Sequence, residues 1–342
     1  MESKKTDVRM SSKPVSYGTA DDKMKALNKK FRRTGISNGL ISGLTYGIYS
    51  TLVMVASGYD PLVSAAGILA APFICSGLND LFAGIFLLFF NAKKGRLKEM
   101  RRTLKTKPGK LLVLGFLLGG PIANGAYLIG LALAGVYAIP ISATCALFGA
   151  LFAWIFLKQR PTARVIVGML ICVVGAIVIN WTKPEGAENF TLGIIFALVA
   201  AICWGLEGVL SSFGGAMIDT DVAVNMRELI SGLVVLVLIV PAVGAFPLLG
   251  DTFLAIKPVY WLILSGLSAA VSFLTWYKAN STVGTAIGMS LNVTYAFWGV
   301  LFCVLFLNQP LTTTIVVGSI VIVSGAILVT MNPLDLLKKE SE

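Results

Sequence analysis

The sequence predicts an all-α integral membrane protein with ten transmembrane helices, arranged as two inverted repeats of five. Three observations predict this fold: the composition, a series of long apolar runs, and an internal repeat. Of the 342 residues, 56% are hydrophobic and only 13% are charged. Soluble domains carry about 25% charged residues. The composition therefore indicates a chain that is surrounded by lipid.

Ten apolar runs approach or exceed the length of about 20 residues that a helix needs to cross a bilayer. In chain order they are 36–57, 62–90, 111–134, 136–157, 165–181, 192–213, 226–249, 259–278, 283–306 and 312–331. The third and fourth runs meet at Gly135 with almost no loop between them. A count of eight or nine helices is therefore the main alternative.

The basic residues predict an orientation for these runs. If the N-terminus is inside, 26 of the 28 Lys and Arg residues lie on the cytoplasmic side, and only Lys183 and Lys257 lie outside. Cytoplasmic loops are typically enriched in Lys and Arg. We therefore expect a multi-pass protein of the plasma membrane with both termini in the cytoplasm. No soluble domain gathers the net charge of +11, so nucleic-acid binding is not indicated.

The two ends of the chain differ from the apolar runs. The first 35 residues contain ten Lys or Arg and no apolar periodicity, which predicts a disordered polybasic cytoplasmic tail over 1–35. Residues 332–342 are expected to form a short cytoplasmic C-terminal tail.

The chain also repeats itself. With an offset of 150 residues, Gly149 to Asn180 matches Gly299 to Thr330 at 13 of 32 positions, including Gln159 with Gln309 and Thr162 with Thr312. We expect the repeats to span 36–181 and 192–331. Because each holds five helices, the second must insert upside down relative to the first. Inverted repeats are typical of secondary transporters, whose substrate sites lie near the midplane between the halves.

Several classes of chemistry lack their usual residues. The chain has no His, the common zinc ligand, catalytic base and proton shuttle. Its cysteines lie singly in apolar runs without metal-ligand spacing; they are Cys75, Cys145, Cys172, Cys203 and Cys303. We therefore expect no catalytic site, no metal and no cofactor. Any proton handling must fall to carboxyl groups.

Over about residues 36–331 the chain resembles the drug/metabolite transporter superfamily, in its EamA-like branch of ten-helix carriers. The resemblance rests on Tyr46-Gly47 and Trp204-Gly205, and on the Phe-Leu-x-Gln segments that end at Gln159 and Gln309. Three stretches are similar to bacterial choline transporters of the Lic type; they are Gly119-Gly120-Pro121-Ile122, Trp204 to Phe213, and Leu291-Asn292-Val293-Thr294-Tyr295. The resemblance implies that helices 1, 3, 6, 8 and 9 line a central cavity.

Ionisable residues inside the spans are candidates for function. Glu207 lies about 9 Å from the predicted cytoplasmic end of its helix at 1.5 Å per residue, without a basic residue within one turn. It is expected to be a counter-charge for a cation, a proton relay or a buried neutral group. Asp80 is open to a functional or a structural role. Arg227 and Glu228, at the start of their run, are explained by snorkelling or a local ion pair, and Lys278 by snorkelling or by pairing with a substrate anion.

Aromatic and amide side chains accompany these carboxyls at helical spacing. Because a ring over a desolvated quaternary ammonium contributes about 0.5–2 kcal/mol, the set suits a small cation. The candidate substrate-binding residues are Tyr46, Tyr49, Asp80, Asn124, Tyr127, Trp204, Glu207, Trp276, Asn292 and Tyr295.

Glycine and proline predict where helices bend or pack closely. Gly119-Gly120-Pro121 and Pro140 predict broken helices that face the pathway. The glycines of the fifth and tenth runs predict close packing of these two helices; they are Gly168, Gly175, Gly318 and Gly325.

These features predict a secondary transporter that works by alternating access, with a small cationic metabolite such as choline as substrate, the lipid bilayer as its surroundings, and protons as the coupling ion through Glu207. The alternative is an exporter of amino acids or drug-like metabolites with the same fold, in which Asp80 and Lys278 bind the two ends of a zwitterion.

Overall fold

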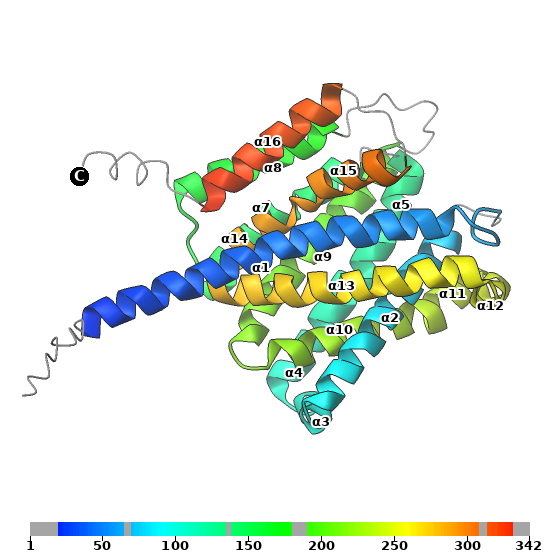
Figure 1. Cartoon of the computed structure of the whole chain (residues 1–342), viewed down its shortest axis with the longest axis horizontal. Helices are drawn as coiled ribbons and strands as arrows, with labels where there is room; N and C mark the ends of the chain where they lie inside the picture. The colour runs from blue at the N-terminus through cyan, green and yellow to red at the C-terminus, as the bar shows by residue number, and fades with distance from the viewer. Residues whose placement is uncertain (1–19, 65–69, 135–137, 180–189, 308–312, 331–342) are drawn as a thin grey trace, which may run out of the picture.

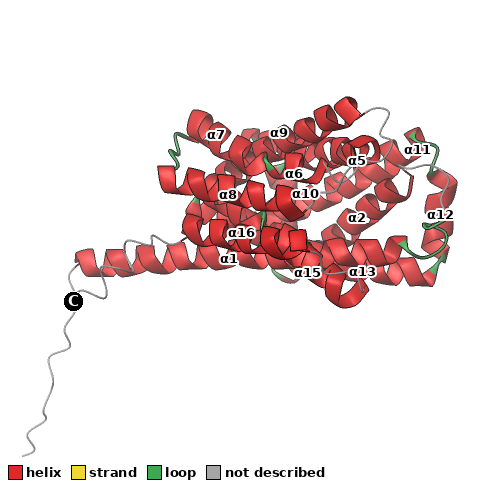
Figure 2. Cartoon of the chain, turned by 90° about the horizontal axis from the view of Figure 1, so that it is seen from above, coloured by secondary structure: helices red, strands yellow, loops and turns green. Residues whose placement is uncertain are grey.

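The computed structural model of this chain describes residues 20–64, 70–134, 138–179, 190–307 and 313–330. Within these ranges every regular element is a helix and there is no strand (Figure 2). The predicted all-α membrane fold is confirmed. In Figure 1 the helices lie side by side in a bundle, with the start of α1 projecting from one end.

The helices follow the apolar runs closely. In chain order they are α1 (Ala20–Ser57), α2 (Ala70–Lys93), α3 (Leu97–Thr103), α4 (Lys107–Leu117), η1 (Leu118–Ile122), α5 (Ala123–Ala134), α6 (Ala138–Ala143), α7 (Cys145–Leu157), α8 (Ala163–Ile179), α9 (Phe190–Gly215), α10 (Thr220–Val234), η3 (Val235–Ile239), α11 (Val240–Ala242), α12 (Phe246–Leu254), α13 (Ile256–Val283), α14 (Thr285–Asn292), α15 (Tyr295–Leu307) and α16 (Thr313–Thr330). The elements η1 and η3 are π-helical turns.

Seven helices in the described residues are long and apolar enough to cross a membrane. Three shorter apolar helices, Cys145–Leu157, Ala163–Val178 and Val316–Val329, lie within the remaining predicted runs. The ten-helix count therefore stays a prediction. Gly135, where the third and fourth runs meet, lies outside the described residues.

The N-terminal boundary differs from the expected one. The helix α1 begins at Ala20, so the segment from Ala20 to Gly35, expected to be part of a disordered tail, is helical. Six of its 16 residues are Lys or Arg, which favour helix. It also extends an existing helix, so no new nucleus has to form. Residues 1–19 lie outside the described ranges.

The predicted helix breaks are present. Pro121 lies inside the π-helical turn η1, because proline has no N–H for the ordinary helical ladder. Pro140 lies in α6, which ends three residues later, at Ala143. In the other half, α14 and α15 are separated at Thr294, the position that matches Thr144 between α6 and α7. Each threonine hydroxyl donates to the carbonyl three residues earlier, at 2.6 Å.

Small residues bring helix backbones close together. A methyl group added to Gly175 would lie 2.8 Å from the carbonyl oxygen of Gly318, and one added to Gly325 would lie 2.7 Å from that of Gly168. The predicted close packing of the fifth and tenth runs, α8 and α16, is confirmed. Without a hydrophobic force between helices in lipid, such close contact drives their association.

Serines of α13 attach this helix to α1. The hydroxyls of Ser265 and Ser268 donate to the carbonyls of Tyr49 and Thr45 at 3.2 and 2.9 Å. One turn further, Ser272 donates to the carbonyl of Ser42 at 3.0 Å. Interhelical bonds of this kind contribute on average about 0.6 kcal/mol each in a membrane, so the row fixes the position of α1 against α13.

Helix contacts occur in matching pairs. The helix α1 packs against α13 and α15, while α9, its counterpart in the predicted second repeat, packs against α5 and α7. The helix α2 packs against α10, its own counterpart. A methyl group on Gly84 would lie 2.9 Å from the backbone nitrogen of Leu229, and one on Gly232 would lie 2.6 Å from that of Leu81. If the two predicted repeats are exchanged, the contacts of α1 become those of α9, and the contact between Gly84 and Leu229 becomes the contact between Gly232 and Leu81.

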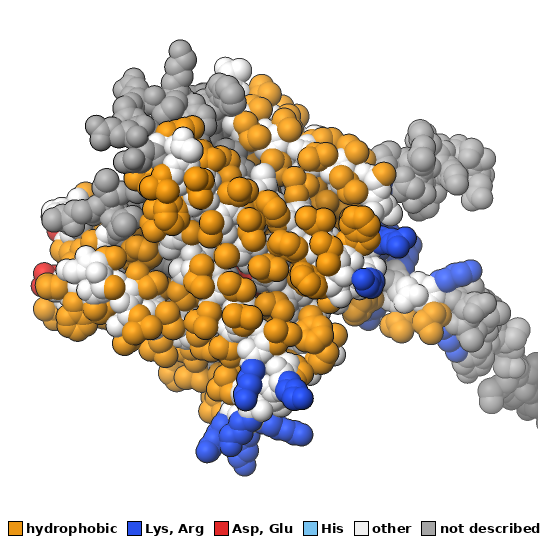
Figure 3. Space-filling model, turned by 180° about the vertical axis from the view of Figure 1, so that it is seen from behind, with side chains coloured by type: hydrophobic (Ala, Val, Ile, Leu, Met, Phe, Trp, Pro, Cys, Tyr) orange, Lys and Arg blue, Asp and Glu red, His pale blue; other side chains and the backbone are white. Residues whose placement is uncertain are grey.

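The outer surface suits lipid. Large apolar side chains such as Phe156, Phe306 and Ile320 are more than 60% exposed. Figure 3 shows a face that is mostly hydrophobic, with Lys and Arg side chains gathered at its lower and right edges.

Candidate functional site

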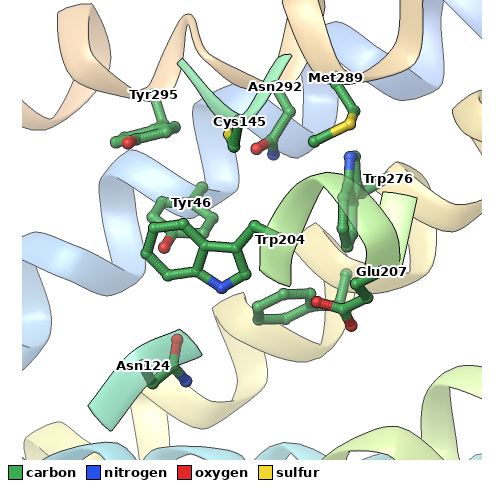
Figure 4. A pocket seen from close by; sticks show the side chains of 10 residues that line it. Tyr46, Asn124, Cys145, Trp204, Glu207, Trp276, Met289, Asn292 and Tyr295 are labelled. Atoms are coloured by element: carbon green, nitrogen blue, oxygen red, sulfur yellow. The ribbon is translucent and has the colours of Figure 1, made fainter. Parts of the chain in front are cut away.

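A cavity lies between the helices of the two predicted repeats. Side chains from α1, α5, α7, α9, α13, α14 and α15 line it (Figure 4). The lining residues are Tyr46, Asn124, Cys145, Trp204, Glu207, Phe273, Trp276, Met289, Asn292 and Tyr295.

Seven of the ten predicted site residues line this cavity. They are Tyr46, Asn124, Trp204, Glu207, Trp276, Asn292 and Tyr295. Cys145, Phe273 and Met289 also line the cavity but were not predicted, because apolar residues in apolar runs carry no distinguishing signal. Helical spacing gives a weak one: Phe273 and Met289 each lie three residues before a predicted site residue, on the same face.

Aromatic rings dominate the lining. The ring centroids of Tyr46 and Tyr295 are 4.5 Å apart, and those of Phe273 and Trp276 are 6.1 Å apart. In the view of Figure 4, Tyr46, Tyr295 and Trp204 lie on one side, and Trp276 lies on the other with Glu207. The cavity therefore presents several π faces together with one carboxylate.

Two predicted residues support the lining from behind. The Tyr49 ring is 4.4 Å from that of Tyr46, and the Tyr127 ring is 5.4 Å from that of Trp204. Neither lines the cavity. Tyr49 and Tyr127 were predicted as binding residues. In the structure each packs against a residue that lines the cavity.

The break in the third run orients Trp204. The Trp204 indole Nε1–H donates to the carbonyl of Gly119 at 2.9 Å, at the π-helical turn where Pro121 disturbs the ladder. The bond fixes the plane of the indole. The Trp276 indole N–H, also buried, has no hydrogen-bond partner among the described residues.

Glu207 is paired, contrary to the expectation that no basic residue lies near it. Its Oε1 accepts from Arg227 Nε at 2.8 Å and from the Tyr277 hydroxyl at 2.9 Å. The cation comes from α10, a different helix, so spacing along α9 did not reveal it. The other oxygen, Oε2, has no hydrogen-bond partner among the described residues. It lies against Gly119, where an added methyl group would overlap it.

Arg227 and Glu228 do not snorkel to the surface. Both are fully buried, and Arg227 Nη1 donates to Glu228 Oε1 at 2.8 Å. The Arg227 guanidinium also stacks on the ring of Phe273, with its Cζ 3.8 Å from the ring centroid. The helix α10 begins at Thr220, so at 1.5 Å per residue Arg227 lies about 10 Å inside it.

Asp80 is buried outside the cavity lining. Its Oδ2 accepts from the Ser231 hydroxyl at 2.6 Å and its Oδ1 from the Asn79 amide at 3.2 Å. Asp80 therefore belongs to the interface between α2 and α10.

Lys278 pairs with a residue of the protein. Its Nζ is 2.8 Å from Asp221 Oδ1, and Lys94 and Arg96 reach Asp221 Oδ2 at 3.0 and 2.7 Å. The group lies at the start of α10 and does not line the cavity. Asp80 and Lys278 pair with different residues and neither lines the cavity, so this geometry does not favour the alternative in which they bind the two ends of one zwitterion.

A model of the EamA-like transporter family matches residues 33–181 and 191–331. The chain is 25% identical over 219 residues to Protein LicB of Haemophilus influenzae, covering 63% of this chain and 73% of that protein. It is 26% identical over 280 residues to the uncharacterized transporter YvbV of Bacillus subtilis, covering 79% and 86%.

A third relative is an uncharacterized transporter of Methanothermobacter thermautotrophicus, 24% identical over 318 residues and covering 86% of both chains. A solved structure titled "Crystal structure of protein" matches with a TM-score of 0.64 and 18% identity, over 85% of this chain and 97% of that one. This likeness concerns the fold.

Proposed function

Since the chain belongs to the EamA-like transporter family, we propose that it is a secondary-active transporter that carries a small quaternary-ammonium cation, such as choline, through the cavity by alternating access. The family and the relatives named as transporters make it a multi-pass membrane transport protein and not an enzyme. The cation, the coupling to protons and the plasma membrane belong to the proposal.

The observation that carries the proposal is the combination of five rings and one carboxylate around a single cavity. The rings are those of Tyr46, Trp204, Phe273, Trp276 and Tyr295, and the carboxylate is Glu207. Each ring face contributes about 0.5–2 kcal/mol toward a desolvated ammonium. Three such contacts plus the charge suffice for micromolar affinity, about −8 kcal/mol. Glu207 Oε2, without a hydrogen-bond partner among the described residues, faces the cation as counter-charge.

The matching helix contacts support alternating access by two inverted repeats. In that mechanism, two halves of equivalent structure rock about a fixed central site. Two halves of equivalent structure are expected to have matching helix contacts and matching helix breaks. This chain has both, in the contacts of α1 and α9 and in the breaks at Thr144 and Thr294. The excess of Lys and Arg in the predicted inner loops supports a cytoplasmic location of both termini.

The competing proposal, an exporter of amino acids or drug-like metabolites, has less support. An amino acid needs a cationic partner for its carboxylate as well as an anionic one for its ammonium. Lys278 and Asp80 do not line the cavity. Arg227, which does lie near it, already stacks on Phe273 and pairs with Glu207 and Glu228.

Glu207→Gln is expected to weaken choline binding about 10- to 150-fold, because it removes the attraction between the carboxylate and the ammonium. Opposite charges 4 Å apart attract by about 1 kcal/mol in water and about 4 kcal/mol near a protein surface, and the expected loss of about 1.5–3 kcal/mol lies between these values. Calorimetric titration of the purified protein and uptake of radiolabelled choline into proteoliposomes measure this. The uncharged isostere 3,3-dimethylbutanol is the matched control, since its affinity does not depend on the carboxylate charge. Unchanged choline binding and uptake at every pH would remove Glu207 from the site.

Tyr295→Leu is expected to raise the Kd for choline about 2- to 30-fold, by loss of one π face worth about 0.5–2 kcal/mol. Tyr295→Phe keeps the face and is expected to bind within about twofold of the wild type. The same titration compares the two variants. Equal losses for leucine and phenylalanine would show that the hydroxyl, not the ring, carries the contact.

A further inference from the structure

We propose that Asp80 and Glu228 together form a proton-binding site behind the cavity, and that a cation bound beside Glu207 drives a proton off this site. The inference rests on the proposed function, because it needs a cation in the cavity. It goes beyond it by assigning the proton to two residues that do not line the cavity.

The site is a buried cluster on the α2, α9 and α10 helices. Glu207, Arg227 and Glu228 are fully buried and Asp80 is 3% exposed. Arg227 lies at the centre, with Nε on Glu207 and Nη1 on Glu228, both at 2.8 Å. The Ser231 hydroxyl, one turn from Glu228 on α10, donates to Asp80 at 2.6 Å.

The cluster holds too many carboxyls for its one cation. Arg227 is the only basic side chain among the buried residues that the structure describes. Three ionised carboxyls against one guanidinium would leave a formal charge of −2 on side chains that are at most 3% exposed. An uncompensated buried charge is strongly unfavourable. A proton on the cluster removes part of this charge.

The hydrogen bonds indicate which carboxyls hold the proton. Glu207 Oε1 accepts from two donors, the Arg227 guanidinium and the Tyr277 hydroxyl. Asp80 receives only neutral donors, Ser231 and Asn79. Glu228 accepts only from the guanidinium, on Oε1, and its Oε2, like Glu207 Oε2, is buried without a hydrogen-bond partner among the described residues. Because Glu228 has one donor fewer than Glu207, it is the carboxyl of the two that gains more from a proton.

The surrounding groups do not change the charge balance. Tyr46 and Tyr49 of α1 interact electrostatically with Asp80 and Arg227, Cys145 of α7 with Glu207, and Tyr277 of α13 with Glu207 and Arg227. Tyrosine and cysteine are ordinarily neutral at pH 7. In the described residues no three acidic or cysteine side chains are arranged to hold a metal ion. The missing positive charge is therefore assigned to a proton.

Arg227 connects the proton site to the cavity. When Glu228 is protonated, the guanidinium charge is available to Glu207 alone, and the cavity is less negative. When the proton leaves, Arg227 is shared by more carboxylates and the cavity attracts a cation more strongly. Binding of the proton and of the cation therefore oppose each other, and by linkage each lowers the affinity for the other.

The test measures protons released when choline binds to the full-length protein in detergent, in weakly buffered solution with a pH-sensitive dye. The wild type is expected to release up to about one proton per choline, and its Kd for choline is expected to rise as the pH falls, by up to about tenfold per unit. Asp80→Asn and Glu228→Gln are each expected to bind choline with much less proton release and a flatter pH dependence.

Asp251→Asn is the matched control, since Asp251 is an exposed carboxyl on α12, and it is expected to release protons like the wild type. Thermal unfolding of each variant verifies that it is folded, and Asp80→Glu, which keeps the carboxyl, is expected to restore release. Choline binding without proton release in the wild type overturns the proposal, as does full release in both variants. Absence of choline binding overturns the proposed substrate instead, so the two failures are distinguishable.

Discussion

Arg227→Gln is expected to leave the protein without a stable fold. The substitution removes the one buried cation that the described residues place among Glu207, Glu228 and Asp80. Breaking a buried ion pair by removing one partner destabilises a protein by about 3–5 kcal/mol. Here two paired carboxylates lose their partner together. Size-exclusion chromatography in detergent, followed by thermal unfolding of any monodisperse fraction, measures the loss.

Three further variants test the reason for this loss. The double substitution Arg227→Gln with Glu228→Gln removes one unpaired charge and is expected to recover part of the stability. Arg227→Lys keeps the charge but not the geometry that reaches both carboxylates, so its stability is expected to lie between those of the wild type and Arg227→Gln. Arg101→Gln, at an exposed arginine of α3, is the control, and surface substitutions of this kind change stability by about 0.5 kcal/mol or less. If Arg227→Gln unfolds no more easily than Arg101→Gln, the buried cluster is not what holds these helices.

Composition and apolar runs were sufficient to predict the fold class, because the bilayer restricts a spanning chain to helices or closed barrels. The positions of the breaks also followed from the sequence, since Pro121 cannot donate to the ladder wherever it lies. The start of α1 was not predicted. Charged residues end an apolar run, but they do not end a helix, and the segment from Ala20 continues the helix outside the apolar run.

The buried ion cluster of Glu207, Arg227 and Glu228 was not predicted from the sequence, for a related reason. The seventh apolar run was taken to begin at residue 226, which placed Arg227 at an interface. The helix begins at Thr220, because Asp219 caps it by accepting from the Asp221 N–H at 2.9 Å. Arg227 therefore lies two turns deeper than hydropathy suggested. Its contact with Glu207 depends on how α9 packs near α10, which no spacing within one helix reveals.

Helical spacing predicted which helix faces point toward the cavity. It did not distinguish the residues that line the cavity from those that pack behind them. Residues three apart differ by about 60° around a helix axis, so Tyr46 and Tyr49 are equivalent by spacing alone. In the structure only Tyr46 lines the cavity, and Tyr49 stacks behind it. The difference depends on the neighbouring α13, whose Ser265 holds the backbone of Tyr49 at 3.2 Å.

Gly119→Ala is expected to abolish or strongly weaken choline binding while the protein stays folded. The new methyl group would overlap Glu207 Oε2 and Cδ, so the carboxylate has to move. It is held by Arg227 at 2.8 Å and Tyr277 at 2.9 Å, and any displacement weakens these bonds and withdraws the charge from its position at the cavity. Overpacking of this kind destabilises by about 1–3 kcal/mol.

If that destabilisation falls on the substrate-bound state, the Kd for choline rises about 5- to 150-fold. Calorimetric titration measures the Kd, and uptake into proteoliposomes measures transport. Gly250→Ala is the matched control: Gly250 lies in the α12 helix with nothing within 4 Å of an added methyl group, so alanine is expected to stabilise by about 0.4–1 kcal/mol and to leave binding unchanged. Gly119→Ala with wild-type affinity would mean that Glu207 is free to move, and its assigned position as counter-charge would be wrong. Loss of binding in Gly119→Ala alone, with thermal unfolding near the wild type, places the effect on the two cavity residues that contact Gly119, which are Glu207 and Trp204.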